Sequence, residues 1–161
     1  MSSYLSDAEL QEFIASLPTR RLAAEALIRD PQGRVLLVEP NYKSDWTVPG
    51  GTVEAGEDPR TGCFREVVEE VGLHLPEGRL LVVHHGVSLG VWGDSVSFVY
   101  DGGVVPAGTP VTVQEEELLS HRWVAPEDFG RYLRPALAHR LRRGLAALAD
   151  GTVAELVDGP R

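Results

Sequence analysis

The sequence predicts an α/β (α+β) protein in which helices pack against a central sheet. Short segments rich in aliphatic residues have the composition of strands, and longer segments with an apolar stripe have the pattern of amphipathic helices. Turn residues such as Asp30-Pro31-Gln32-Gly33 separate these segments. The predicted strands cover residues 20–30, 34–40, 79–92, 95–103 and 152–159, with residues 91–95 as a hairpin connection.

The N-terminal segment, residues 1–18, is predicted to contain a helix. Ser6 and Glu9 have the spacing of a capping box, and Pro18 stops the helix. The apolar stripe of this helix consists of Leu10, Phe13, Ile14 and Leu17. A structural role, a lid and a dimer contact are all compatible with such a stripe, so the sequence leaves the three open.

Two further helices are predicted near the C-terminus, a short one over residues 126–132 and a long one over residues 136–149. The long helix carries an apolar stripe of leucines at helical spacing, the arrangement of a helix that packs on a core. Its arginines Arg140, Arg142 and Arg143 are therefore expected to point outward.

In the predicted strand 79–92, His84 and His85 are adjacent, so their side chains point to opposite faces and do not easily form a pair of metal ligands.

Composition limits the function classes. A chain of 161 residues with 43% hydrophobic and 24% charged residues is typical of one globular domain, here 1–161. A net charge of −9 argues against a nucleic-acid-coating protein, and no DNA-binding segment is recognised. No apolar run is long enough for a membrane span and no signal-peptide layout is present, so a cytoplasmic location is expected. The single cysteine, Cys63, excludes an intrachain disulfide and is expected to be buried.

The stretch 51–73 is the most informative part of the chain. Glu66, Glu69 and Glu70 are spaced at i, i+3 and i+4, which places them on one face of a helix. The apolar residues of this segment fall on the opposite face. Asp58 and Pro59 are suited to the start of the helix, and the end is marked by Gly72. Gly62, on the acidic side, leaves room for a ligand to approach the glutamates.

Three carboxylates within one helical turn repel one another, and a cation relieves that repulsion. Hard divalent ions such as Mg²⁺ prefer oxygen ligands and keep positions for water and substrate phosphates. Most glutamate-rich helix faces are nevertheless simply solvated. The wider spacing makes the metal-binding interpretation more specific. The pattern is Gly51, five residues, Glu57, seven residues, Arg65-Glu66, an aliphatic residue, any residue, Glu69-Glu70, any residue, Gly72 and an aliphatic residue.

This pattern resembles the signature of the Nudix hydrolases, with every position filled. The resemblance implies a Nudix-like α/β/α sandwich with a mixed central sheet. It also implies an Mg²⁺- or Mn²⁺-dependent pyrophosphohydrolase that cleaves a nucleoside diphosphate linked to another moiety. The substrate is expected to be a nucleotide-type small molecule, for which an (oxidised) nucleoside triphosphate and an ADP-ribose-like compound both remain open. Ser88 stands where a proline is associated with ADP-ribose hydrolysis.

The resemblance also assigns roles to individual residues. The predicted metal ligands are Glu66, Glu69, Glu70 and the carbonyl of Gly50. The predicted catalytic residues are Glu66, Glu69 and Glu117, and which glutamate acts as general base stays open. The predicted structural supports are Gly51, Glu57, Arg65 and Gly72. The predicted substrate contacts are Trp46, Lys43 and Glu116, with Tyr42, Trp92 and Tyr100 as further aromatic candidates for stacking on a base.

Two alternative functions and one assembly state are also compatible with the sequence. The chain could be a catalytically silent Nudix-fold sensor, but the complete set of glutamates favours an enzyme. An isoprenyl diphosphate isomerase is disfavoured because the only cysteine, Cys63, lies inside the signature helix. Family members often form dimers, so a homodimer is a possible assembly.

Overall fold

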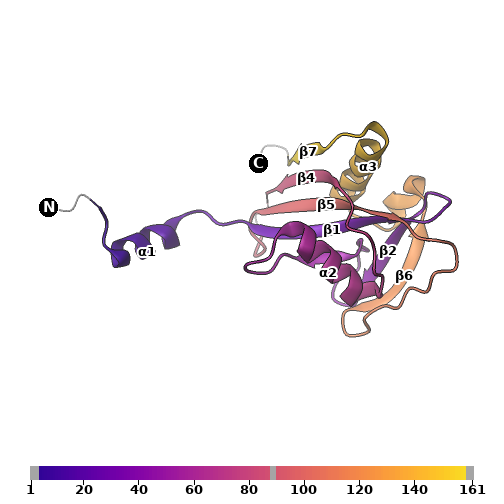
Figure 1. The fold of residues 1–161 in the computed structure, drawn as a ribbon, viewed down its shortest axis with the longest axis horizontal. Helices are drawn as coiled ribbons and strands as arrows, with labels where there is room; N and C mark the ends of the chain where they lie inside the picture. Colours follow the sequence, from indigo (N-terminus) through magenta and orange to yellow (C-terminus); the bar gives the residue numbers. More distant parts are fainter. Residues whose placement is uncertain (1–3, 88–89, 159–161) are drawn as a thin grey trace.

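The computed structural model describes residues 4–87 and 90–158, so Ser88 lies outside the described residues. In this part of the chain a mixed seven-stranded sheet has the order β6-β2-β1-β5-β4-β7, with β3 paired to β1 (Figure 1). The strands are β1 (Arg21–Arg29), β2 (Val35–Pro40), β3 (Gly50–Thr52), β4 (Leu80–Gly86), β5 (Ser95–Val104), β6 (Leu118–Val124) and β7 (Ala154–Val157). The helices are α1 (Asp7–Ser16), α2 (Pro59–Val71), the 3₁₀ helix η1 (Pro126–Arg131) and α3 (Pro135–Asp150).

The sheet is mixed because β1 pairs with β5, and β4 with β7, in parallel, whereas the other named pairs are antiparallel. The helices α2 and α3 flank it on different sides. The mixed sheet with flanking helices expected from the sequence is therefore confirmed. No helix among the described residues combines the length and apolarity needed to cross a membrane.

Strand β1 separates two cores by simple alternation. Its even-numbered residues Ala24, Ala26 and Ile28 are buried together with the apolar face of α2. The odd-numbered Leu27 is buried on the other face, in the core that includes Ala147 of α3. Side chains on a strand alternate between faces, so one strand serves both layers. The polar odd-numbered positions of β1 therefore lie on the α3 side of the sheet.

Helix α3 approaches the sheet closely at Gly144. A Cβ atom there would lie 3.2 Å from Leu27 Cδ1 and 3.5 Å from Val82 Cγ2. The C-terminal half of α3 thus covers the apolar part of this face. The more N-terminal residue Arg140 lies beside the polar part of the same face, where the pocket described below is formed.

The N-terminal helix begins and ends near the predicted positions, but its apolar stripe is not covered. The capping box is present, because Ser6 Oγ accepts from Glu9 N–H and the Glu9 carboxylate accepts from Ser6 N–H. No residue of α1 is buried, and Phe13 and Ile14 are each more than half exposed. Figure 1 shows α1 projecting away from the sheet.

The connection after β4 differs from the predicted hairpin. Strand β4 ends at Gly86 and β5 begins at Ser95, so the predicted strand 79–92 is too long. Just after β4 the N–H of Val87 donates to Asp158 Oδ2 (2.8 Å), a contact with the distant C-terminal segment that takes the place of a strand hydrogen bond. The chain therefore leaves the sheet several residues earlier than the aliphatic composition suggests.

The register of β6 can be tested with two neighbouring leucines. Leu118 is 3% exposed and belongs to the core beneath α2, whereas Leu119 is 63% exposed. We expect Leu118→Ala to lower the free energy of unfolding by about 2–5 kcal/mol, because it removes a buried side chain and leaves a cavity. Leu119→Ala is the matched control and should change it by less than about 0.5 kcal/mol. Urea denaturation measures both, and equal losses would contradict the register.

Candidate functional site

Helix α2 starts and ends where its capping residues direct. The Asp58 carboxylate accepts from the N–H groups of Arg60 and Thr61 (both 3.0 Å), which satisfies two free donors of the first turn. Gly72 closes the helix with φ 68°, a left-handed conformation that glycine adopts without strain. Between these caps the helix presents Glu66, Glu69 and Glu70 along the edge next to β3.

Arg65 is the centre of an ion-pair network on this edge. Its guanidinium binds the Glu57 carboxylate through two nitrogens, at 2.8 Å from Nε and 3.1 Å from Nη2. Its Nη1 donates to both Glu66 Oε1 and Glu69 Oε2 (3.0 Å each). The hydrogen bonds from Arg65 hold the pKa of Glu57 below its ordinary value. One side chain thus connects the loop before α2 with two of the three glutamates that are candidate metal ligands.

Two glycines make room for this network. A Cβ atom at Gly51 would lie 2.7 Å from the Glu66 carboxylate. A Cβ atom at Gly62 would lie 2.7 Å from Glu57 Oε2. Gly62 is buried, so the prediction that it opens the helix face to a ligand is wrong. Its missing side chain is the space that the Glu57 carboxylate occupies.

Glu70 is the most buried of the three helix carboxylates, with an exposed fraction of 7%. Its Oε2 accepts from the backbone N–H of Gly50 at 2.9 Å. Burial raises its pKa to about 7, and the charges of Glu66 and Glu117 contribute to the increase while the Gly50 hydrogen bond opposes it. Without a neighbouring cation, the Glu70 carboxyl group therefore changes its protonation state near neutral pH.

Glu66 and Glu117 lie close to Glu70. Burial raises the pKa of Glu66, and the neighbouring charges of Glu69 and Glu117 act in the same direction. Glu117 stands in the turn before β6, held there by a hydrogen bond from the Asn41 N–H to its carbonyl (2.9 Å). The adjacent Glu116 is exposed, and its carbonyl accepts from Asn41 Nδ2 (2.6 Å). Of these two neighbouring glutamates, Glu117 is thus the one whose charge reaches the helix carboxylates.

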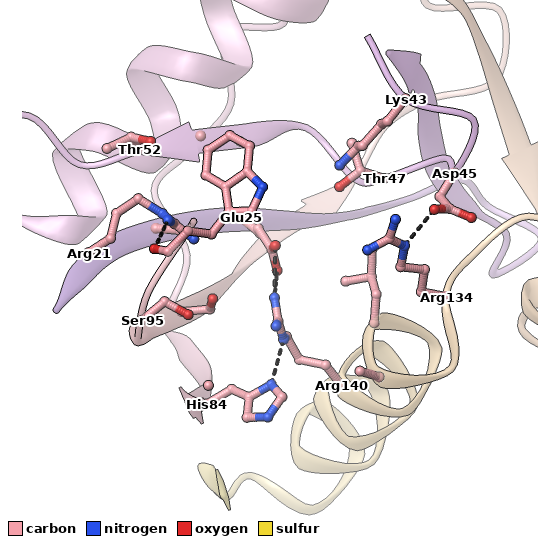
Figure 2. A pocket seen from close by; sticks show the side chains of 18 of the residues that line it. Arg21, Glu25, Lys43, Asp45, Thr47, Thr52, His84, Ser95, Arg134 and Arg140 are labelled. Atoms are coloured by element: carbon pink, nitrogen blue, oxygen red, sulfur yellow. Dashed lines mark hydrogen bonds and ion pairs between the residues drawn. The ribbon is translucent and has the colours of Figure 1, made fainter. Parts of the chain in front are cut away.

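A pocket of about 610 Å³ opens beside this edge on the α3 side of the sheet (Figure 2). Alternate residues of three adjacent strands form its floor. These floor residues are Arg21, Ala23 and Glu25 of β1, Ser95 and Ser97 of β5, and His84 and Gly86 of β4. Glu70, Gly50 and Gly51 also line the pocket, so the helix carboxylates and the pocket form one continuous site.

Several pocket residues escaped the sequence analysis. The prediction that Arg140 points outward is wrong: its side chain is 14% exposed and binds Glu25 and His84. His84, considered in the sequence only as an unsuitable partner of His85 for a metal ion, is buried at the pocket floor. The available signal was Glu25, a charged residue in the interior of an otherwise aliphatic strand. Such a residue needs a partner when it is buried.

The predicted substrate contacts divide into two groups. Trp46 and Lys43 line the pocket, whereas Glu116 does not. Trp46 is braced by Tyr132, with ring centroids 5.5 Å apart in an edge-to-face arrangement. Partial burial lowers the pKa of Lys43. Of the further aromatic candidates, Tyr42 and Trp92 line the pocket.

Tyr100 is excluded from the pocket by its position. It is 6% exposed, belongs to the core on the α2 side and packs against Phe64 at a centroid distance of 6.4 Å. Cys63 belongs to the same core, where burial raises the pKa of its thiol. Both residues therefore stabilise the packing of α2 and do not face the site.

The oxygen-rich helix edge suits a hard divalent cation. Within residues 4–87 and 90–158, however, no three metal-binding side chains already converge. Arg65 holds Glu66 and Glu69, while Glu70 is turned to Gly50. Burial is the main cause of the raised pKa of Glu66 and of Glu70, the charges of neighbouring glutamates add to it, and a cation beside these carboxylates would oppose it. The carboxylate oxygens of Glu66, Glu69 and Glu70 are a donor set that suits Mg²⁺ or Mn²⁺.

Comparison with known proteins gives matches over most of the chain. A MutT-like protein of Streptomyces ambofaciens is 26% identical over 130 residues, which cover 78% of this chain and 77% of that protein. A human m7GpppN-mRNA hydrolase is 44% identical over 61 residues, but these cover only 38% of this chain and 16% of that protein. The crystal structure of a MutT protein from Methanosarcina mazei superimposes with a TM-score of 0.69 and 27% identity, covering 83% of this chain and 99% of that one.

The family model of the NUDIX domain matches residues 19–148, which include the whole signature and every strand except β7. The match leaves out the exposed helix α1. Together with the fold and the glutamate-bearing helix edge, it shows that the chain belongs to the Nudix family, whose pyrophosphohydrolases act on phosphoanhydride bonds.

Proposed function

We propose that this protein is an Mg²⁺- or Mn²⁺-dependent pyrophosphohydrolase that cleaves a nucleoside diphosphate linked to another moiety. The proposal rests above all on the position of Glu70. This buried carboxylate belongs both to the glutamate edge of α2 and to the wall of the pocket. A phosphoanhydride bound at this wall would have candidate metal ligands on one side and the pocket for the rest of the molecule on the other.

Glu66, Glu69, Glu70 and the carbonyl of Gly50 are the proposed ligands of the cation. A bound divalent cation would supply positive charge next to the phosphoryl oxygens and increase the acidity of water. The chain itself must then accept a proton from the attacking water. Glu117 is suited to this role, since its carboxylate is exposed to solvent and stands close enough to influence Glu66 and Glu70 electrostatically.

Positive side chains at the pocket complement an anionic substrate. Arg134 is paired with Asp45, whereas Lys43 has no ion pair with a carboxylate in the described part of the chain. Lys43 also lies near enough to Glu70 to lower its pKa slightly. We therefore assign Lys43 to the phosphate oxygens that lie between the glutamate edge and the pocket.

Arg65 and Glu57 are assigned a supporting role. A guanidinium presents a planar fork that fits a carboxylate, and its remaining nitrogens hold Glu66 and Glu69 near the edge of α2. Gly51 supports the same arrangement by leaving space for the Glu66 carboxylate. These residues position the proposed ligands and do not take part in proton transfer.

A substrate screen with a glutamine variant tests the activity. We expect Mg²⁺- or Mn²⁺-dependent cleavage of at least one of nucleoside triphosphates, their oxidised forms, ADP-ribose, dinucleoside polyphosphates and nucleotide sugars. Glu69→Gln and Glu70→Gln should each lower kcat by about 100-fold or more, because a ligand or base is lost. Glu127→Gln, at an exposed glutamate of η1, is the control with unchanged kcat. No cleavage of any compound, with thermal shifts on nucleotide addition, would favour the silent sensor.

Glu70 should also control how the metal-free protein responds to pH. The unfolded chain loses this proton near 4.5, but the folded chain keeps it until about 7. The folded state thus binds more protons in this window, so the free energy of unfolding falls as pH rises through it, by on the order of 3 kcal/mol. Glu70→Gln should lose most of this fall, with a remainder from Glu66, whose pKa is also raised. Glu69→Gln, at a side chain that is 50% exposed, should retain it.

Urea denaturation in EDTA across the window from pH 4.5 to pH 7 measures the difference between these proteins. Parallel curves for the unmodified chain and Glu70→Gln would show that Glu70 is not the group responsible. A proton and a cation compete for the Glu70 carboxylate, so the affinity for Mg²⁺ should rise with pH over this window.

A further inference from the structure

A chain of four polar side chains crosses the pocket floor from β1 to Asp158, the last described residue. Figure 2 shows three of them, Glu25, Arg140 and His84. Arg140 Nη1 lies 2.8 Å from both carboxylate oxygens of Glu25, and both side chains are 14% exposed. Arg140 Nε donates to His84 Nδ1 at 2.9 Å. His84 Nε2 lies 2.8 Å from Asp158 Oδ1. All four residues line the pocket, and none belongs to the glutamate edge of α2.

We propose that Glu25 and Arg140 form a hydrogen-bond acceptor–donor pair that selects the moiety attached to the diphosphate, and that His84 and Asp158 position this pair. The inference rests on the proposed pyrophosphohydrolase activity and adds the residues that determine its specificity. The group they would recognise is a polar ring that carries a donor and an acceptor side by side. The edge of a nucleobase and the substituents of a sugar both have this chemistry.

Arg140 keeps donors available for such a ring. A guanidinium has five N–H donors, of which those of Nε and Nη1 are directed to His84 and Glu25. Within residues 4–87 and 90–158, Nη2 makes no hydrogen bond to the protein. In the same part of the chain, only Arg29 Nε is a buried side-chain nitrogen or oxygen without a partner. Arg140 Nη2 is therefore accessible from the pocket.

Glu25 supplies the neighbouring acceptor. A carboxylate offers about four lone-pair sites, and the contacts to Arg140 Nη1 leave some of them available. Because the ion pair fixes both groups, their order around the pocket is fixed as well. The hydroxyl-bearing residues Ser95 and Ser97 line the same floor. A floor of this polarity suits a hydrogen-bonding ring and not an acyl chain.

His84 is held in a single tautomer. Arginine has no acceptor, so His84 Nδ1 must accept from Arg140 Nε, and the imidazole proton resides on Nε2. Nε2–H then donates to Asp158, whose other oxygen accepts from the N–H of Val87 (2.8 Å). Hydrogen bonds from Val87 and His84 keep the pKa of Asp158 below its ordinary value. With both ring nitrogens engaged by protein groups, the imidazole fixes the guanidinium plane, which makes His84 a positioning residue.

The test compares discrimination between substrates in two series. One series holds the triphosphate constant and varies the base (ATP, GTP, ITP, CTP and UTP). The other holds UDP constant and varies the sugar. We expect kcat/KM to vary by about 100-fold or more within one series for the unmodified protein, because a site built to form hydrogen bonds rejects analogues that lack them. The series that shows the spread identifies the base or the sugar as the recognised ring.

The double variant Glu25→Met/Arg140→Met should reduce this spread to less than about tenfold by raising KM for the preferred substrate. Replacing both members avoids an unpaired buried charge, which single variants would leave. Arg143→Met, at an exposed arginine of the same helix, is the matched control and should leave the spread unchanged. A spread that survives in the double variant would overturn the assignment.

Two conservative changes test His84 separately and do not depend on whether the double variant folds. An asparagine oxygen can replace Nδ1 as the acceptor for Arg140, whereas a glutamine amide extends toward the position of Nε2. His84→Asn should therefore retain most of the discrimination, and His84→Gln should lose it through KM with kcat unchanged. Equal behaviour of the two variants would refute the positioning role.

The outcomes also separate this inference from the proposed function. If the unmodified protein cleaves neither these compounds nor the oxidised nucleoside triphosphates, ADP-ribose and dinucleoside polyphosphates of the wider screen, the pyrophosphohydrolase proposal fails and the inference fails with it. If it cleaves them with metal dependence but without discrimination in either series, only the inference fails. Metal-dependent cleavage with discrimination that vanishes in Glu25→Met/Arg140→Met supports both.

Discussion

The arrangement of the site depends on the guanidinium of Arg65. Its planar fork binds Glu57 from the loop and Glu66 and Glu69 from the helix, so the segment before α2 cannot move independently of the carboxylates. A lysine at this position could not reach all three groups in one plane. The spacing of the signature follows from this geometry. Glu57 must arrive from the loop, and glycines must stand where its carboxylate and that of Glu66 lie.

The helix of the site was accessible from the sequence because all its determinants are local. Asp58 and Gly72 mark its ends, and the spacing of the three glutamates places them on one face. The pocket was not accessible in the same way. Glu25, Arg140, His84 and Asp158 come from four separate segments, and they meet only because β1, β5 and β4 are neighbours in the sheet. Nothing in their sequence spacing indicates that order.

The glutamate edge and the pocket belong to different layers of the sandwich. The glutamate edge belongs to the layer of α2, where Cys63 and Phe64 face the apolar core. The pocket belongs to the layer of α3, where the strands change from apolar to polar between Leu27 and Glu25. Glu70 and the short strand β3 connect them at the margin of the sheet. Bond cleavage and substrate selection are thereby assigned to separate sets of side chains.

The alternation along β1 has a consequence for how such proteins diversify. The even-numbered Ala24, Ala26 and Ile28 are constrained by packing under α2, whereas the odd-numbered Ala23 and Glu25 line the pocket. Exchanges at Ala23 can therefore alter substrate preference while the scaffold stays intact, whereas an exchange at Glu25 must be matched at its ion-pair partner Arg140. An inserted or deleted residue would do the opposite, since a slip by one position would drive Glu25 into the aliphatic layer. This strand therefore tolerates substitution at its pocket-facing positions more readily than any change in its length.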